Sequence, residues 1–201
     1  MGAALRRHNV TFRAPVELLG MHLTDSQVIR RVVLGDQEAF ALLVDRYHAR
    51  CLRVATHLLA DADEADDAVQ EAFVRAYRHM GGYREQDKFG AWLMRIVVNQ
   101  CRTLLARERR GVDRVEQSIA RDLQHVDLDA AGAAADRYDE LARALVQLPA
   151  EQREAVVLRF ADELSFDEMS TITGVGVSAL KMRVQRACAR LRTILAEHIH
   201  A

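Results

Sequence analysis

The sequence is poor in the residues that usually stabilise small secreted proteins and β-rich folds. It holds three cysteines and two prolines, and aromatic residues make up 5% of its 201 positions. Cys51, Cys101 and Cys188 lie far apart, with no C-x-x-C pair and no histidine at ligand spacing. This pattern argues against a disulfide framework or a zinc site, and we expect reduced thiols in or near a helical core.

Long apolar runs are also absent, since no stretch approaches the roughly 20 residues that a helix needs to cross a bilayer. Arg6, Arg7 and Arg13 are not followed by the apolar segment and cleavage site of a secretory signal. We therefore expect a cytoplasmic protein without membrane insertion of its own. A net charge of −1 does not indicate nucleic-acid binding, which must be judged from local clusters of charge.

The residues that are abundant favour helices. Half of the chain is hydrophobic, and apolar residues recur at helical spacing over two long segments. We predict an all-α protein of two small helical domains, residues 23–110 and 138–201, joined by a flexible acidic linker, residues 111–137. Residues 1–22 lack periodicity and are predicted to be a disordered extension, in which Met21 is an alternative translation start.

The second segment carries a helix-turn-helix pattern. Ser165 and Glu168 form a capping box for a short helix, and Gly174 and Gly176 bracket a turn before a helix that begins near Ser178. No acidic residue occurs between Met169 and Ala196, whereas lysine and arginine recur. The residues predicted to share the exposed face are Ser178, Lys181, Met182, Gln185 and Arg186. This arrangement favours a helix that enters the DNA major groove over an ordinary solvated basic helix.

A predicted helix at residues 89–109 combines aromatic and basic residues. Phe89 and Trp92 stand at its start, and Arg95, Asn99 and Arg102 share one face. Such a surface suits an unpaired strand, because bases stack on rings while arginine binds phosphates. Core packing is the alternative role for the aromatic residues, and we expect Trp92 to be at least partly in the core.

A third cluster is acidic. Asp61, Asp63, Glu64, Asp66, Asp67 and Glu71 crowd one loop and the helix that follows. The helix dipole alone would favour about half of them. No matching histidine, second carboxylate cluster or glycine-rich phosphate loop accompanies the cluster, so we predict no catalytic residue, no metal and no cofactor. A surface for a basic protein partner fits better.

These segments together resemble a known family. Residues 66–77, DDAVQEAFVRAY, look like the region 2 signature of the sigma-70 family, and residues 89–99, FGAWLMRIVVN, are similar to the segment that follows it. Residues 148–192, which begin LPAEQREA, resemble region 4. A chain with only these two regions is typical of the extracytoplasmic-function group.

The resemblance implies an alternative sigma factor, which is not an enzyme and which directs core RNA polymerase to promoters. Residues implied to contact polymerase are Asp66, Asp67, Gln70 and Glu71. Those implied to melt and read the −10 element are Lys88, Phe89, Trp92, Arg95, Asn99 and Arg102. Those implied at the −35 element are Ser178, Lys181, Met182, Arg183, Gln185 and Arg186, with Arg183 placed on the DNA backbone. The implied partners are the polymerase β′ and β subunits, promoter DNA and an anti-sigma factor.

Two positions depart from the family pattern. Met182 stands where family members usually have serine, and it cannot donate a hydrogen bond, so a different −35 sequence is expected. Thr103 stands where the family often has aspartate. Two rival functions remain at this stage: a helix-turn-helix regulator that binds duplex operator DNA without polymerase, and an enzyme with a metal held by carboxylates of residues 63–71.

Overall fold

The computed structural model describes residues 23–84, 88–112 and 133–199. In chain order the elements are α2 (Asp25–Val33), η1 (Gln37–Ala39), α3 (Phe40–Leu59), α4 (Ala62–His79), η2 (Met80–Gly82), α5 (Phe89–Val112), α6 (Ala133–Val146), α7 (Ala150–Phe160), α8 (Phe166–Thr173) and α9 (Val177–Ile199). No strand occurs in these ranges, so the predicted all-α fold class is confirmed. The predicted disorder of residues 1–22, with Met21, lies outside the described residues.

Local signals explain where several helices begin and end. The Thr24 hydroxyl accepts a hydrogen bond from the Gln27 amide (3.3 Å), and the Gln27 side chain accepts one from the Thr24 amide (2.8 Å), so the capping box of α2 is complete. After α2, Gly35 has φ of 102°, a backbone conformation that disfavours other residues. Asp61 caps α4 by accepting from the Glu64 amide at 2.9 Å.

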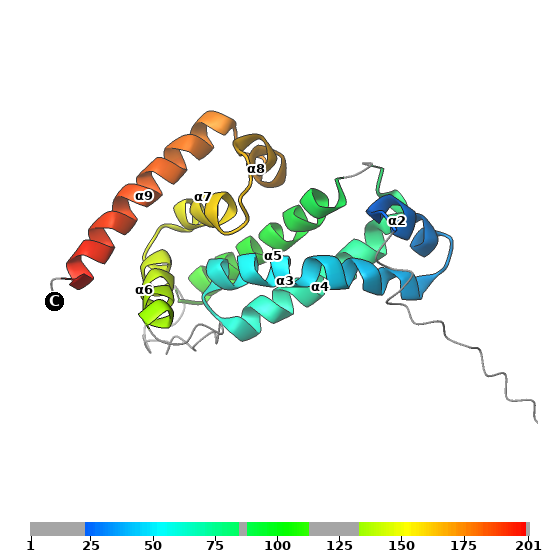
Figure 1. The fold of residues 1–201 in the computed structure, drawn as a ribbon, viewed down its shortest axis with the longest axis horizontal. Coiled ribbons are helices and arrows are strands. Elements are labelled where there is room, and N and C mark those ends of the chain that lie inside the picture. Colours follow the sequence, from blue (N-terminus) through cyan, green and yellow to red (C-terminus); the bar gives the residue numbers. More distant parts are fainter. Residues whose placement is uncertain (1–22, 85–87, 113–132, 200–201) are drawn as a thin grey trace, which may run out of the picture.

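The N-terminal half is a bundle of α3, α4 and α5, with α2 packed on α3 at one end (Figure 1). Its apolar positions follow helical spacing and meet in the centre of the bundle, where Leu43, Val54, Val69 and Leu93 are fully buried. The C-terminal half packs α7, α8 and α9 around Leu158, Met169, Ile172 and Leu180.

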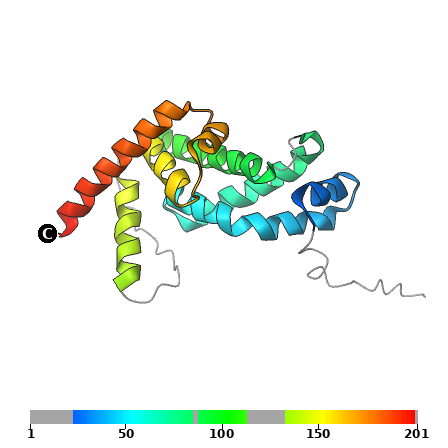
Figure 2. The same cartoon turned by 45° about the horizontal axis from the view of Figure 1, so that its top comes forward.

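The two halves contact each other directly. In Figures 1 and 2, α7 lies between α9 on one side and α3 on the other, and α8 contacts α5. Buried residues of both halves belong to one continuous hydrophobic cluster. Two small helical units are therefore present as predicted, but their packing against each other was not part of the sequence prediction.

The segment between the halves is shorter than predicted at both ends. Helix α5 continues to Val112, and α6 begins at Ala133, five residues before Tyr138. Alanine has the highest helix propensity, which accounts for a helix that begins in the alanine run 133–135. The predicted flexibility of the linker concerns residues 113–132, which lie outside the described part of the chain.

Candidate nucleic-acid and protein interfaces

The helix-turn-helix of the C-terminal half is built from the local signals seen in the sequence. The Ser165 hydroxyl accepts from the Glu168 amide at 3.3 Å, and Glu168 in turn accepts from the Ser165 amide at 2.8 Å. These bonds lower the pKa of the Glu168 carboxyl below its ordinary value. Helix α8 ends at Gly174, which has φ of 72°, and the chain then turns into α9. The turn orients α9 as the second helix of the motif.

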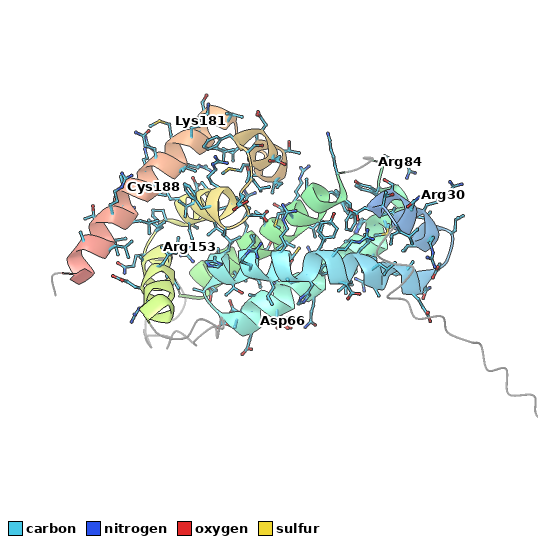
Figure 3. All side chains as sticks on the ribbon, in the orientation of Figure 1. Arg30, Asp66, Arg84, Arg153, Lys181 and Cys188 are labelled. Carbon is cyan, nitrogen blue, oxygen red and sulfur yellow. The ribbon has the colours of Figure 1, made fainter. Side chains whose placement is uncertain are left out.

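One face of α9 is exposed along its first turns. Its members are Ser178, Lys181, Met182, Gln185 and Arg186, whereas Leu180 and Ala187 on the opposite face are fully buried. Figure 3 shows Lys181 on the outer edge of the molecule. Lysine, glutamine and arginine can bond to base edges or phosphates, so this face has the side chains that a DNA-reading surface needs.

Two cations share an aromatic ring at the base of this face. The Lys181 ammonium lies 5.7 Å from the centre of the Phe166 ring, and the Arg159 guanidinium lies 5.3 Å from it. Both separations are within the range of cation–π attraction. Phe166 was not among the sequence-predicted site residues, and no charge or spacing signal in the sequence would have identified it.

Arg183 is less accessible than its neighbours on α9. Its guanidinium pairs with the Glu151 carboxylate of α7 at 2.6 Å, and its side chain is only a quarter exposed. An arginine that lies beside the main exposed face is better placed for a phosphate than for a base edge.

Helix α5 carries the second predicted reading surface. Lys88, Arg95 and Asn99 are exposed, and Trp92 is half-buried. The Arg102 guanidinium lies 3.4 Å from the Asn99 side-chain oxygen, so these two residues are brought together as the spacing predicted.

The predicted direct contact of Phe89 with DNA needs correction. Phe89 is 1% exposed, and its ring packs against Tyr47 (5.4 Å between ring centres), Tyr83 (6.0 Å) and Trp92 (5.6 Å). A ring enclosed in this way cannot stack on a base. Its physical role is to support the half-buried Trp92 from below, which agrees with the core-packing alternative.

Arg102 is not free at the surface of α5. Its guanidinium donates to both carboxylate oxygens of Glu154 in α7, at 2.6 and 2.7 Å, and approaches the Thr173 carbonyl at 3.4 Å. A similar pair joins Arg50 of α3 to Asp162, at 2.5 and 2.9 Å. These hydrogen bonds raise the pKa of both arginines above their ordinary value. Sequence reasoning missed both pairs, because their members are 52 and 112 positions apart.

A cavity of about 580 Å³ lies beside these pairs, between the two halves. Cys101 and Leu105 of α5 line one wall, and Ala150 and Val175 line the other. The contact between the halves is therefore incompletely packed near Arg102.

The acidic surface lies on α4, on the opposite edge of the view in Figure 3 from Lys181. Asp67 and Gln70 are exposed, and Asp66 accepts a hydrogen bond from Gln70. The Arg75 guanidinium lies 2.7 Å from Glu71 and lowers the pKa of that carboxyl. Two large apolar residues, Val74 and Tyr77, are also exposed here, at 41% and 36%. The sequence analysis had not selected them, although their mixture with acids is typical of a protein-binding surface.

Within the described ranges no three histidine, cysteine, aspartate or glutamate side chains are grouped so that they could hold a metal ion. In the same part of the chain, no helix combines the length and hydropathy needed to cross a membrane.

Comparison with known proteins relates both surfaces to one family. Residues 43–111 match the family model "Sigma-70 region 2", and residues 138–191 match "Sigma-70, region 4". The RNA polymerase sigma-H factor of Pseudomonas aeruginosa is 35% identical over 174 residues, which cover 81% of this chain and 89% of the relative. The ECF RNA polymerase sigma-E factor of Escherichia coli K12 is 32% identical over 177 residues, which cover 82% and 91%.

Solved structures show the same relationship. CnrH, in a complex with the cytosolic domain of CnrY, superimposes with a TM-score of 0.62 at 26% identity and covers 85% of this chain and 96% of its own. The sigma factor RpoE of Bartonella quintana, in a complex with the anti-sigma factor NepR, has a TM-score of 0.62 at 25% identity and covers 78% and 96%.

The region 2 match includes α4 and α5, which a regulator that uses only its helix-turn-helix would leave unexplained. The rival function as an operator-binding regulator is therefore not favoured. The chain belongs to the sigma-70 family, in its extracytoplasmic-function group, and is an alternative sigma factor.

Proposed function

We propose that the chain reads promoters with two surfaces held on separate domains, residues 23–110 and 138–201, and carries out no catalysis itself. The observation that carries this proposal is the exposed face of α9 on the second helix of a complete helix-turn-helix, in a chain whose α5 offers a second basic face. Sequence specificity would come from these side chains, and much of the affinity from phosphates. Its place of action would be the cytoplasm.

At the −35 element, the proposed contacts to base edges come from Lys181, Met182, Gln185 and Arg186. Ser178 begins this face, and Arg183 would bind a phosphate. Met182 is 46% exposed and can make only apolar contacts, for which the thymine methyl group is the matching base feature in the major groove.

At the −10 element, the proposed contacts come from Lys88, Trp92, Arg95, Asn99 and Arg102, with Phe89 as support for Trp92. The half-buried indole offers a stacking surface for a base flipped from the melted strand, while the basic residues hold the backbone. Duplex opening would then be coupled to recognition, since an unpaired base is the form that fits.

Polymerase binding is proposed for the α4 surface of Asp66, Asp67, Gln70 and Glu71, extended by Val74. Acidic and apolar side chains together suit a partner with basic residues around an apolar patch. The β′ and β subunits of core polymerase are the proposed partners. The sigma factor similar to this chain that was solved with NepR supports an anti-sigma factor as a further proposed partner.

Transcription with purified components tests the function. The chain and core polymerase together should initiate at specific genomic promoters, and aligned upstream DNA from mapped starts should show a −10 and a −35 element. The free chain should bind duplex promoter DNA weakly. Failure to start transcription at any genomic promoter would refute the proposed function.

The α4 surface is tested by charge reversal. The variant Asp67→Lys/Glu71→Lys should lose binding to core polymerase in a pull-down or by fluorescence anisotropy, because like charges would then face each other. Its circular dichroism spectrum should match that of the wild type, since surface pairs such as Glu71–Arg75 contribute about 1 kcal/mol or less.

The matched control is Asp45→Lys, an exposed acid on α3, compared with Asp67→Lys alone. The two single changes alter the net charge equally. Equal affinity of Asp67→Lys and Asp45→Lys for core polymerase would remove the assignment of this surface.

A further inference from the structure

Two arginines of the N-terminal half are bound by carboxylates of the C-terminal half. Arg50 meets Asp162, and Arg102 meets Glu154, each through two nitrogens of the guanidinium. The carboxylates are almost enclosed, with side chains 2% and 9% exposed, whereas the arginines keep 33% and 38% of their exposure. Two-pronged geometry and burial make these the strong form of an arginine–carboxylate pair.

The two arginines line one face of the N-terminal bundle, along α5. Arg102 stands on α5 itself, and Gly90 at the start of α5 allows Arg50 of α3 to lie alongside. A Cβ at residue 90 would lie 2.8 Å from the Tyr47 ring and 3.4 Å from the Arg50 guanidinium. Residues 90 and 102 are twelve positions apart, or about 18 Å along a helix. That span matches about five stacked nucleotides at 3.4 Å per step.

The docked arrangement cannot read a whole promoter. Arg102 approaches the Thr173 carbonyl at 3.4 Å, and Lys181 follows Thr173 by eight residues, which span less than about 30 Å even when fully extended. The −10 and −35 elements are separated by about 25 base pairs, or roughly 85 Å of duplex. DNA is stiff over this length. The halves must therefore separate, and this step rests on the proposed function.

Separation would leave both guanidinium groups without their carboxylates. A phosphodiester offers the same geometry as a carboxylate, two oxygens that accept parallel bonds from one guanidinium. We propose that Arg50 and Arg102 form a binding site for the backbone phosphates of the melted strand, and that Asp162 and Glu154 occupy this site while the chain is closed. The DNA strand and the C-terminal half then compete for the same two arginines.

Competition makes the closed chain a poor ligand for single strands. The apparent affinity of a protein is reduced by the fraction of molecules in the binding-competent state. Neutral isosteres of the two carboxylates should raise that fraction, because an enclosed arginine without its counter-charge is strongly destabilising and opening returns it to water.

The test uses the full-length chain and a fluorescent 15-residue oligothymidine, since phosphate contacts do not depend on base sequence. Glu154→Gln/Asp162→Asn should bind this probe about tenfold more tightly than the wild type at 100 mM salt. Its radius of gyration by X-ray scattering should increase. Cys101, which lines the cavity between the halves, should react faster with iodoacetamide, while Cys51 stays slow.

Adding Arg50→Gln to this double variant should reverse most of the gain in affinity. It should also reduce the slope of log affinity against log salt by about 0.7, the value for one phosphate on a single strand. The control Glu163→Gln/Asp167→Asn alters the net charge equally on exposed carboxylates of the same half and should leave binding and dimensions unchanged.

Unchanged dimensions and unchanged probe affinity in Glu154→Gln/Asp162→Asn would overturn the proposal. So would an opened chain whose affinity and salt slope do not respond to Arg50→Gln. If circular dichroism shows that the double variant is unfolded, the single variants Glu154→Gln and Asp162→Asn give the same comparison. Promoter-specific transcription by the wild type is measured separately, so a failure of the proposed function is distinguishable from a failure of this site.

Discussion

At the residue scale, burial controls the chemistry of two of the three thiols. Cys51 and Cys101 are each 1% exposed, and burial raises the pKa of both to about 12. The thiolate is the reactive form, so both should be nearly inert near neutral pH. Iodoacetamide at pH 8 should modify the half-buried Cys188 first and Cys51 only on unfolding, as peptide mass spectrometry would show. Equal rates for Cys51 and Cys188 in the folded chain would contradict this.

Phe166 is the second feature at this scale. Because its ring lies against both Lys181 and Arg159, we expect Phe166→Leu to keep the local packing but lose the cation–π attraction. A loss of about 0.5–1 kcal/mol at an exposed site corresponds to a roughly two- to fivefold weaker affinity for a −35 duplex mapped from transcript starts. Fluorescence anisotropy would measure it.

A double-mutant cycle separates positioning of Lys181 from a general effect on folding. In a Lys181→Ala background the Phe166→Leu change should have clearly less effect on affinity, because the attracted cation has gone. An effect of the same size in both backgrounds would show that Phe166 does not act through Lys181.

At the scale of elements, the capping box of α8 holds the helix-turn-helix together. Ser165→Ala removes the acceptor for the Glu168 amide and should destabilise the C-terminal half by about 1 kcal/mol, measured by thermal or urea unfolding. Thr171→Ala is the matched control, since it removes a hydroxyl from the exposed side of the same helix and should cost only a few tenths of that.

The same box predicts a pH dependence. The pKa of Glu168 is lowered from 4.5 in the folded chain, mainly by its hydrogen bonds to Ser165, so its ionised form stabilises the fold. This contribution is present above pH 4.5 and disappears as the pH falls through the lowered pKa. The difference in melting temperature between wild type and Glu168→Gln should therefore shrink below pH 4.5. A constant difference down to pH 2 would exclude this role.

At the scale of the whole molecule, one arginine joins three helices. Arg153 of α7 is 8% exposed and donates to the Leu58 carbonyl in the last turn of α3 (2.7 Å) and to the Val146 carbonyl at the end of α6 (2.9 Å). Carbonyls in the last turn of a helix have no partner within that helix, and the helix dipole favours a cation there. Arg153 therefore stabilises two helix ends and the contact between the halves at once.

Replacing this residue should be costly. Arg153→Met keeps much of the apolar volume but leaves two enclosed carbonyls without their donor, at about 1–3 kcal/mol each. Urea unfolding should show a loss of about 2–5 kcal/mol, whereas Arg190→Met on the exposed side of α9 should stay within about 0.5 kcal/mol. A loss below 1 kcal/mol for Arg153→Met would mean that water replaces the guanidinium.

Much of the fold could be predicted because its signals are local. The capping boxes at Thr24 and Ser165, the left-handed glycines 35 and 174, and the buried face of α9 depend on residues within a few positions of one another. Phe89 shows where this reasoning stops. An aromatic residue at a helix start suits either a core or a base-stacking surface, and only its enclosure by Tyr47, Tyr83 and Trp92 decides between them.

The sequence by itself determined the helical class, the two regions and the faces of α5 and α9, because periodicity, capping and charge clustering are properties of neighbouring residues. Only the tertiary structure decided that Arg50 and Arg102 are bound by Asp162 and Glu154, and that Arg153 spans the two halves. Those pairs join residues from 52 to 112 positions apart. Their approach depends on how whole helices pack, which no local pattern encodes.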